Sequence, residues 1–419
     1  MRNQAIVACT ALAGLCLLLS NTLPASDMKT AVGMALERDE GLNALDQRRL
    51  GLKERSVADG ALPDPEIMIG AEGVPVTDPF NADMMTMYKV GMRQRFPAGS
   101  TRELARERTL HQADGLGADL QARRLDIARQ TRLAWLEWAT AWQSLELARE
   151  AVEAFAELNE ITMTRYRAGT GRQRDVDQAR MELAMLERRV LVKKTRLDEA
   201  SSRLTRWTGQ QPSGVPDMPA DAELRARSLD DLSERLHRHP LLQASDHRIE
   251  AGVTDTRLAR QAYRPSWMVE AGYAHTRGMD PMTMSRQSDK LFAMVSFSIP
   301  LFTANRQDRR LTAARSELEA LNHDRGLELQ QMQGELDRQH SAWHRLTEQV
   351  EWLETRVLSS AEATVESTLS AYRADRATFD ELVRARLALL DQELELINVR
   401  QAHWAAEIEL AWLTAEALQ

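Results

Sequence analysis

The chain has 419 residues, and 54 Lys and Arg residues against 62 Asp and Glu residues give a net charge of −8. Hydrophobic residues make up 43% and charged residues 28%, which excludes a disordered or collagen-like chain. The acidic balance argues against nucleic acid as a partner, because binding to phosphates needs clustered Lys and Arg. Only 20 Gly and 13 Pro residues interrupt a sequence rich in Ala, Leu, Arg, Glu and Gln, which is typical of long helices.

Residues 1–25 have the pattern of a secretory signal peptide. One basic residue precedes a mostly apolar run that ends at Leu19, and small residues lead to Ala25, where we place the cleavage. An N-terminal membrane anchor is the alternative, although the run is short for a span. Residues 6–9 (Ile-Val-Ala-Cys) resemble a lipoprotein cleavage site but precede the apolar core, which argues against lipidation. Both cysteines lie in this segment, so the mature chain is expected to have no disulfide or thiolate metal site.

The rest of the chain reads as two copies of one pattern, residues 26–220 and 221–419. The motif Tyr-Arg-Ala-Gly at 166–169 returns as Tyr-Arg-Ala-Asp at 372–375. Each copy is too long for a solenoid repeat, so we interpret it as a duplicated half-molecule.

Each copy is expected to contain a helix, two short strands and two long helices, in that order. No segment after the signal peptide has the 18 or so consecutive apolar residues of a membrane-spanning helix. The expected elements of the first copy are a helix over 28–57, strands over 66–73 and 86–96, and helices over 98–168 and 172–210. Those of the second copy are a helix over 228–262, strands over 266–276 and 290–299, and helices over 303–372 and 376–417.

The long helices carry a seven-residue apolar period. It runs from Val176 to Leu204 in the first copy and from Leu382 to Leu410 in the second. A period of seven sustained over this length predicts left-handed coiled-coil packing. A helix of about 70 residues spans roughly 105 Å, far longer than a globular-domain helix.

Apolar and polar residues alternate along the expected strands, as at Ile67, Ile69 and Ala71. This alternation is typical of membrane-barrel strands, and an ordinary half-buried sheet is the alternative. Four strands cannot close a barrel, and an open sheet edge is not tolerated in lipid. Spanning strands therefore require several chains to share one barrel. Two chains would give about eight strands, a barrel filled by its own side chains, whereas three would give about twelve, enough for an open duct, so we favour a trimer.

Two motifs, each present in both halves, resemble the TolC family of outer-membrane efflux channels. The first motif is Val-Gly-Met-Arg-Gln-Arg-Phe-Pro at 90–97, with Phe-Ser-Ile-Pro-Leu-Phe at 297–302. The second is the Tyr-Arg-Ala turn at 166–169, followed by Asp-Val-Asp-Gln-Ala-Arg at 175–180. The segments at 62–65, 84–87 and 305–308 look most like the heavy-metal (CzcC-like) branch of that family.

The resemblance implies a mainly α fold with a small β part: four very long coiled-coil helices and four barrel strands per chain. It implies a homotrimer with a shared 12-stranded β-barrel in outer-membrane lipid and a helical tunnel in the periplasm. It also implies docking to a periplasmic adaptor (membrane fusion) protein and an inner-membrane RND-type pump. We expect no cofactor and no nucleic acid.

Both Tyr-Arg-Ala turns join long helices, so they should lie at one end of the tunnel, which the resemblance identifies as the periplasmic entrance and the adaptor-docking surface. In a trimer, Asp175 and Glu381 would each form a ring of like charge that attracts cations. The alternative is ordinary acidic charge at a helix N-terminus. Asp375 stands where the first turn has a glycine. The candidates for gating or docking are Tyr166, Arg167, Gly169, Asp175, Tyr372, Arg373, Asp375 and Glu381.

Methionine is frequent, with 18 residues, and it clusters before the second strand of each half. Thioether sulfur suits Cu(I) and Ag(I), so these clusters are candidate metal ligands. Flexible filling of gaps is the alternative. The clustered residues are Met84, Met85, Met87, Met279, Met282 and Met284.

Motifs for catalysis are missing from the sequence: there is no Walker loop, dinucleotide-binding fingerprint or GxSxG elbow. His340 and His344 lack the glutamate of an HExxH site, and we interpret them as a surface or tunnel-lining pair. We therefore expect no enzyme but a passive exit duct of a tripartite efflux system, for heavy-metal ions, with copper or silver favoured. The alternatives are a duct for drugs, organic solutes or polypeptides, and a periplasmic coiled-coil adaptor without a barrel.

Overall fold

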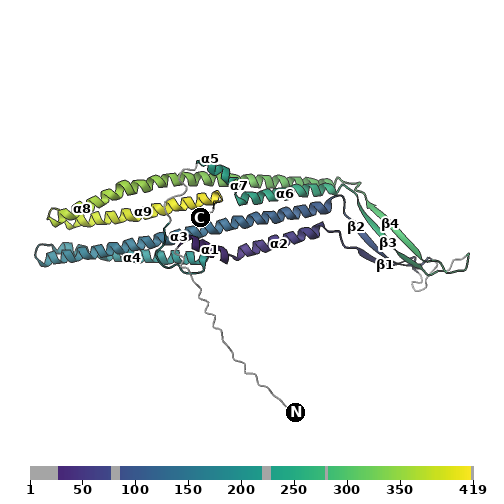
Figure 1. Cartoon of the computed structure of the whole chain (residues 1–419), viewed down its shortest axis with the longest axis horizontal. Helices are drawn as coiled ribbons and strands as arrows, with labels where there is room; N and C mark the ends of the chain where they lie inside the picture. The colour runs from purple at the N-terminus through teal and green to yellow at the C-terminus, as the bar shows by residue number, and fades with distance from the viewer. Residues whose placement is uncertain (1–26, 77–84, 219–227, 279–281, 417–419) are drawn as a thin grey trace, which may run out of the picture.

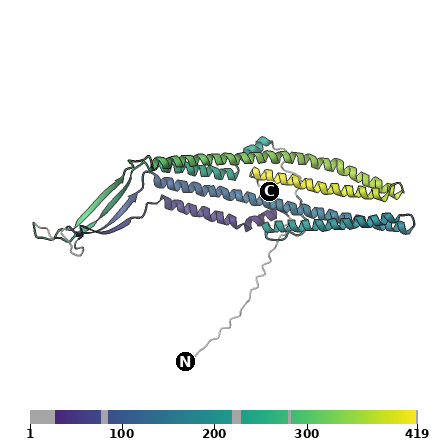
Figure 2. The ribbon, with the colours of Figure 1, turned by 180° about the vertical axis from the view of Figure 1, so that it is seen from behind.

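The computed structural model describes residues 27–76, 85–218, 228–278 and 282–416. The molecule is elongated, with a four-stranded sheet at one end and the turns of two helical hairpins at the other (Figure 1). Figure 2 shows the same arrangement from behind. The expected signal peptide, residues 1–25, lies outside the described residues.

Both halves have the same order of elements. The first contains α1 (Met28–Arg38), α2 (Glu40–Gly60), β1 (Glu66–Glu72), β2 (Met87–Phe96), α3 (Thr101–Arg167) and α4 (Gln173–Thr208). The second contains α5 (Leu229–Leu236), α6 (Pro240–Gln261), β3 (Ser266–Thr276), β4 (Lys290–Ser298), α7 (Gln307–Trp352), η1 (Leu353–Leu358), α8 (Ser359–Arg373) and α9 (Phe379–Leu413).

The prediction of one unbroken helix at the start of each half was wrong. Asp39 is extended and caps α2, because its carboxylate accepts a hydrogen bond from the Leu42 amide at 2.8 Å. The same carboxylate accepts two hydrogen bonds of 2.8 Å from Arg123 on α3, which holds the break in place. In the second half, His239 is extended and Pro240 starts α6, where proline has no amide hydrogen to continue the helix.

The predicted helix over 303–372 is also interrupted, because η1 inserts a π-helical turn between α7 and α8. The other long helices match their predicted ranges closely. Val176, Leu204, Leu382 and Leu410, at the ends of the two heptad runs, are nearly fully buried, and the members between them, such as Leu183 and Leu197, are at least half-buried. The hydropathy period therefore identified the packed face of these helices correctly.

The strands form one antiparallel sheet in the order β1-β2-β3-β4. The two halves of the chain meet at its centre, where β2 pairs with β3 from Met87 opposite Thr276 to Phe96 opposite Trp267. The last pair is also a stacked ring pair, with centroids 4.2 Å apart.

The register places the apolar and charged residues on opposite faces of the sheet. One row reads Ile69, Val90, Tyr273 and Leu291 across the four strands. Ile69 is 84% exposed and Leu291 85%, so the apolar face covers no core of the described chain. This outcome excludes the half-buried sheet that the alternation also allowed.

The opposite face carries charge. A row three residues along the strands from the Ile69 row reads Glu66, Arg93 and Glu270. The Arg93 guanidinium lies 3.5 Å from the Glu66 carboxylate and 2.5 Å from that of Glu270.

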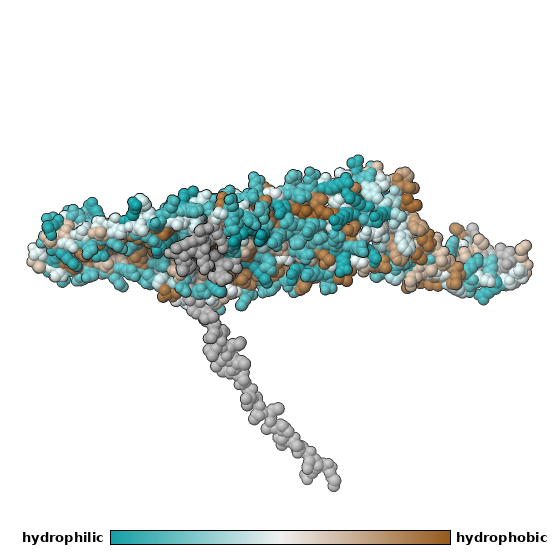
Figure 3. Space-filling view, turned by 45° about the horizontal axis from the view of Figure 1, so that its top comes forward, coloured by the Kyte–Doolittle hydropathy of each residue, from teal (hydrophilic) through white to brown (hydrophobic). Residues whose placement is uncertain are grey.

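The helical body is hydrophilic over most of the face in Figure 3, and apolar surface gathers toward the end that carries the strands. Among the described residues, no helix is both long enough and apolar enough to cross a membrane.

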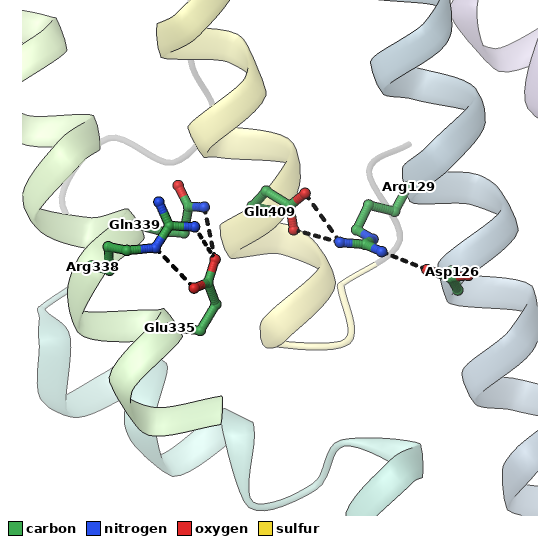
Figure 4. A network of polar contacts seen from close by, with 6 residues as sticks. All are labelled: Asp126, Arg129, Glu335, Arg338, Gln339 and Glu409. Atoms are coloured by element: carbon green, nitrogen blue, oxygen red, sulfur yellow. Dashed lines mark hydrogen bonds and ion pairs between the residues drawn. The ribbon is translucent and has the colours of Figure 1, made fainter. Parts of the chain in front are cut away.

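A polar network joins the two halves in the middle of the body (Figure 4). Arg129 on α3 donates to both carboxylate oxygens of Glu409 on α9, at 3.1 and 3.0 Å, and to Asp126 at 2.7 Å. The Arg129 guanidinium also lies over the Trp412 ring, 4.5 Å from its centroid. On α7, Glu335 accepts from Arg338 and Gln339, and the Arg338 hydrogen bond lowers the pKa of Glu335.

Candidate functional site

The hairpins α3–α4 and α8–α9 end in turns of the same backbone design, at the same end of the molecule (Figure 1). In the first turn, the amides of Thr170 and Gly171 both donate to the Arg165 carbonyl at 2.9 Å. In the second turn, the amides of Arg376 and Ala377 both donate to the Ala371 carbonyl, at 2.8 and 3.3 Å. The repeated motif therefore gives two matching turns.

Gly169 and Asp375 occupy the same left-handed position in the two turns, with φ of 76° and 57°. Glycine has no steric penalty there, whereas other residues adopt this region rarely and aspartate is one of the better tolerated. The carboxylate of Asp375 forms an ion pair with Arg165 of the other hairpin. Aspartate in place of glycine at position 375 thus gives the second turn a charged side chain that pairs with the first hairpin.

Arg165 is the residue that connects the two tips, and the sequence analysis did not select it. Besides its ion pair with Asp375, it donates to the Tyr372 carbonyl at 3.3 Å. Its guanidinium lies over the Tyr372 ring, 4.9 Å from the centroid. The Asp375 hydrogen bond raises the pKa of Arg165, and the charge of Asp175 acts in the same direction. One cation therefore contacts the backbone, ring and carboxylate of the second tip.

Two further polar contacts continue this connection along α4 and α9. Gln178 donates to Asp380 at 3.0 Å, and Arg189 donates to Asp391 at 2.8 Å. The Gln178 hydrogen bond is the main cause that lowers the pKa of Asp380. Both pairs have the same separation of 202 residues, a regularity between the copies that the sequence analysis overlooked.

The two acidic ring candidates have different surroundings. Asp175 has a side chain that is 19% exposed, 4.0 Å from Arg174. Glu381 instead forms a capping box: its carboxylate accepts from the Thr378 amide at 2.7 Å, which lowers its pKa. The Glu381 carboxylate thus caps the N-terminus of α9, in line with the alternative of ordinary acidic charge at a helix N-terminus.

The two tyrosines of the repeated motif also differ. Tyr372 is buried and packs on Phe379, with ring centroids 6.0 Å apart, in the apolar cluster that joins the hairpins. Tyr166 is 42% exposed, and the arginines that follow the two tyrosines in sequence, Arg167 and Arg373, are exposed as well. The tip therefore presents an aromatic and basic surface.

The methionine clusters lie at the far end of the molecule from the tips. Met84 and Met279 fall outside the described residues. Met87 begins β2 opposite the end of β3, and the Arg277 amide donates to the Thr86 carbonyl at 3.2 Å, so the two loops are adjacent. The remaining members are exposed: Met85 is 69%, Met282 95% and Met284 77% exposed.

The chain thus combines helical hairpins closed by matched turns with a four-stranded sheet whose apolar face is exposed. The chain belongs to the outer membrane efflux protein family, whose sequence model matches residues 33–210 and 232–416. This match confirms the resemblance to TolC-family efflux channels. No curated protein sequence matches the chain.

Solved structures of outer-membrane channels share the fold. CusC, described in terms of folding and transmembrane channel formation, is 16% identical, with 93% of this chain and 92% of CusC covered and a TM-score of 0.78. The outer-membrane channel OprN is 16% identical, with 93% and 90% covered and a TM-score of 0.75. The outer membrane protein VceC of Vibrio cholerae is 18% identical, with 94% and 97% covered and a TM-score of 0.74.

Proposed function

We propose that this protein is the outer-membrane exit duct of a tripartite efflux system and acts as a homotrimer. The observation that carries the proposal is the exposed apolar face of the sheet, with Ile69 and Leu291 at its edge strands. Lipid would cover this face, and the charged row around Arg93 would line the water-filled interior. The outer strands β1 and β4 would pair with those of neighbouring copies, which closes twelve strands without an edge in lipid.

The long helices would continue the barrel as a periplasmic tunnel, and the hairpin tips would close it. Arg165 supports this role, because it ties one tip to the other through contacts that opening would break. Asp175 and Glu381, repeated three times, would favour cations at the entrance.

The partners proposed are a periplasmic adaptor (membrane fusion) protein and an inner-membrane RND-type pump, which would supply the energy. The exposed tip residues Tyr166, Arg167 and Arg373 suit docking, since aromatic and Arg side chains are enriched in protein interfaces. A periplasmic adaptor without a barrel is the weaker alternative, because a water-soluble protein rarely leaves such an apolar face uncovered.

Heavy-metal ions are the proposed cargo, with copper or silver favoured. The methionine-bearing loops support this choice, because they meet where the Arg277 amide donates to the Thr86 carbonyl, and Met85 of one loop and Met282 and Met284 of the other are exposed. Drugs, organic solutes or polypeptides are the alternative cargo.

Deletion of the gene in its host, followed by growth on Cu, Ag, Zn, Co and Cd salts and on antibiotics and detergents, tests the cargo. Sensitivity to Cu and Ag alone supports the soft-metal duct, and sensitivity to organic compounds alone overturns it. Complementation with Met85→Leu/Met282→Leu/Met284→Leu then tests the loops. The matched control is Met181→Leu/Met185→Leu, which changes exposed methionines on α4.

Outer-membrane fractionation and chemical cross-linking test the duct independently of the cargo. We expect a detergent-extracted trimer, whereas a soluble periplasmic protein would contradict the barrel and favour the adaptor.

A further inference from the structure

A cluster of two imidazoles and a carboxylate connects α3 to α6, two helices that run side by side (Figure 1). It consists of His111 on α3 and His247 and Glu250 on α6. One potential ligand atom from each residue lies within 4.8 Å of the others. We propose that this cluster is a binding site for a divalent transition-metal ion of the Zn²⁺ class, resident in the helical body and separate from any exported cargo.

The distances within the cluster are close to those of a coordination shell. Oε2 of Glu250 lies 3.0 Å from Nδ1 of His111 and 3.0 Å from Nδ1 of His247. Ligand atoms at about 2.0–2.1 Å from a tetrahedral Zn²⁺ are roughly 3.3 Å apart. Small side-chain rotations would therefore admit the ion between the three atoms.

The donor types select the class of metal. Two imidazoles and one carboxylate suit zinc and its neighbours, whereas the thioethers of the methionine loops suit Cu(I) or Ag(I). Three protein ligands would leave one tetrahedral position for water. The side chains of His111, His247 and Glu250 are 25%, 33% and 51% exposed, so ions can reach them from solvent.

A second carboxylate lies near one of the ligands. Glu107, one turn before His111 on α3, places Oε1 3.7 Å from Nε2 of His111, the ring nitrogen that faces away from Glu250. Arg257 on α6 donates to the same Glu107 oxygen at 3.1 Å. An outer carboxylate that accepts the second N–H of a histidine ligand fixes its tautomer and orientation. The 3.7 Å separation is longer than a hydrogen bond, so we assign Glu107 as a positioning residue that a small movement toward Nε2 of His111 would engage when the ion binds.

The backbones that carry the ligands are fixed by their own contacts. Two ion pairs flank the cluster and bridge α3 and α6: Arg248 with Asp119 at 2.9 Å, and Arg108 with Asp255 at 3.3 Å. Between these pairs, the Cβ of His247 lies only 3.5 Å from where a Cβ at Gly115 would be. The helices thus approach closely at the ligands, and a bound ion would link the first half of the chain to the second.

The test is isothermal titration of the full chain, without a histidine tag, with Zn²⁺ after treatment with chelator. A His340→Ala/His344→Ala background removes the other histidine pair, whose rings lie 4.6 Å apart. We expect about one Zn²⁺ per chain and a thermal midpoint that rises with Zn²⁺ concentration. His247→Ala and Glu250→Gln should each weaken binding by more than about tenfold, and Glu107→Gln by about tenfold.

The matched control is His323→Ala, which removes an exposed histidine on α7 and should leave the affinity unchanged. Because the ligands are partly exposed, these variants should fold, and circular dichroism checks this. The visible spectrum of bound Co²⁺ is a second readout, and His111→Ala should change it. The proposed site would be overturned if the His340→Ala/His344→Ala variant binds no Zn²⁺. It would also be overturned if Zn²⁺ binding survives both His247→Ala and His111→Ala.

Discussion

The contact between Arg165 and the second hairpin makes a quantitative prediction about opening of the tips. Replacement by Gln keeps the side chain polar but shortens it and removes its charge. The ion pair with Asp375 is weak, about 0.5 kcal/mol, because the Asp375 side chain is 76% exposed. The hydrogen bond to the Tyr372 carbonyl contributes about 1 kcal/mol and the contact with its ring about 0.5 kcal/mol.

These contributions sum to about 2 kcal/mol per chain, which corresponds to roughly a 30-fold shift in the closed-to-open equilibrium of one tip. If the three tips of a trimer open together, the shift becomes about 6 kcal/mol, or roughly 10⁴-fold. Conductance of single trimers in planar bilayers measures the open fraction directly. Trimers that mix wild-type and Arg165→Gln chains distinguish independent from concerted opening.

Two controls distinguish loss of the Arg165 contacts from general damage at the tip. Asp375→Asn keeps a residue that tolerates the left-handed position, so it should remove only the ion pair and open the tip slightly. Arg167→Gln removes a neighbouring exposed charge and should leave conductance unchanged. If Arg165→Gln conducts like the wild type while Arg167→Gln opens the channel, the proposal that Arg165 holds the tips closed is incorrect.

Three further predictions concern stability and selectivity. Burial lowers the pKa of His239 from 6.5 to about 4. Between pH 6.5 and 4, His239 therefore binds a proton in the unfolded chain but not in the folded one. The free energy of unfolding should fall by about 3 kcal/mol as the pH drops through this range. In His239→Asn, which retains a capping side chain, the thermal midpoint should lose this pH dependence. Glu409→Gln should lower stability by about 2 kcal/mol in thermal unfolding, since it weakens the partner of Arg129, and an unchanged midpoint would contradict this. Glu381→Gln should preserve the capping box, and hence stability, but reduce cation selectivity in bilayers if the ring acts on ions; unchanged selectivity would limit Glu381 to its capping role.

The strands and long helices were predictable because their periods are strong and local. The limits of β3 match the predicted range, and β4 ends one residue earlier than expected. The breaks before α2 and α6 were missed, since each depends on a cap that competes with a continuing helix. At Asp39, that cap is strengthened by Arg123, which lies 84 residues further along the chain.

The candidate site was predictable only at the level of the backbone. The repeated motif located both turns, whereas the left-handed position of Gly169 is known only from the structure. The role of Arg165 was not predictable either, because its partners lie about 207 residues away and Ala371 occupies its place in the second copy. Duplication therefore preserves the turns, whereas the side-chain contacts between the copies have diverged.

This divergence makes the two kinds of contact in the proposed trimer unequal. Around the axis of the trimer, each α8–α9 hairpin would contact two α3–α4 hairpins. One belongs to its own chain and the other to the next chain. The contact within a chain has Arg165 on Tyr372, whereas the equivalent contact between chains would pair Ala371 with Tyr166 and would have no such cation. We therefore expect opening to begin between chains. Since the mature chain should have no cysteine, Tyr166→Cys/Ala371→Cys tests this expectation: oxidation should link neighbouring chains and block conductance, whereas linked trimers that still conduct would contradict it.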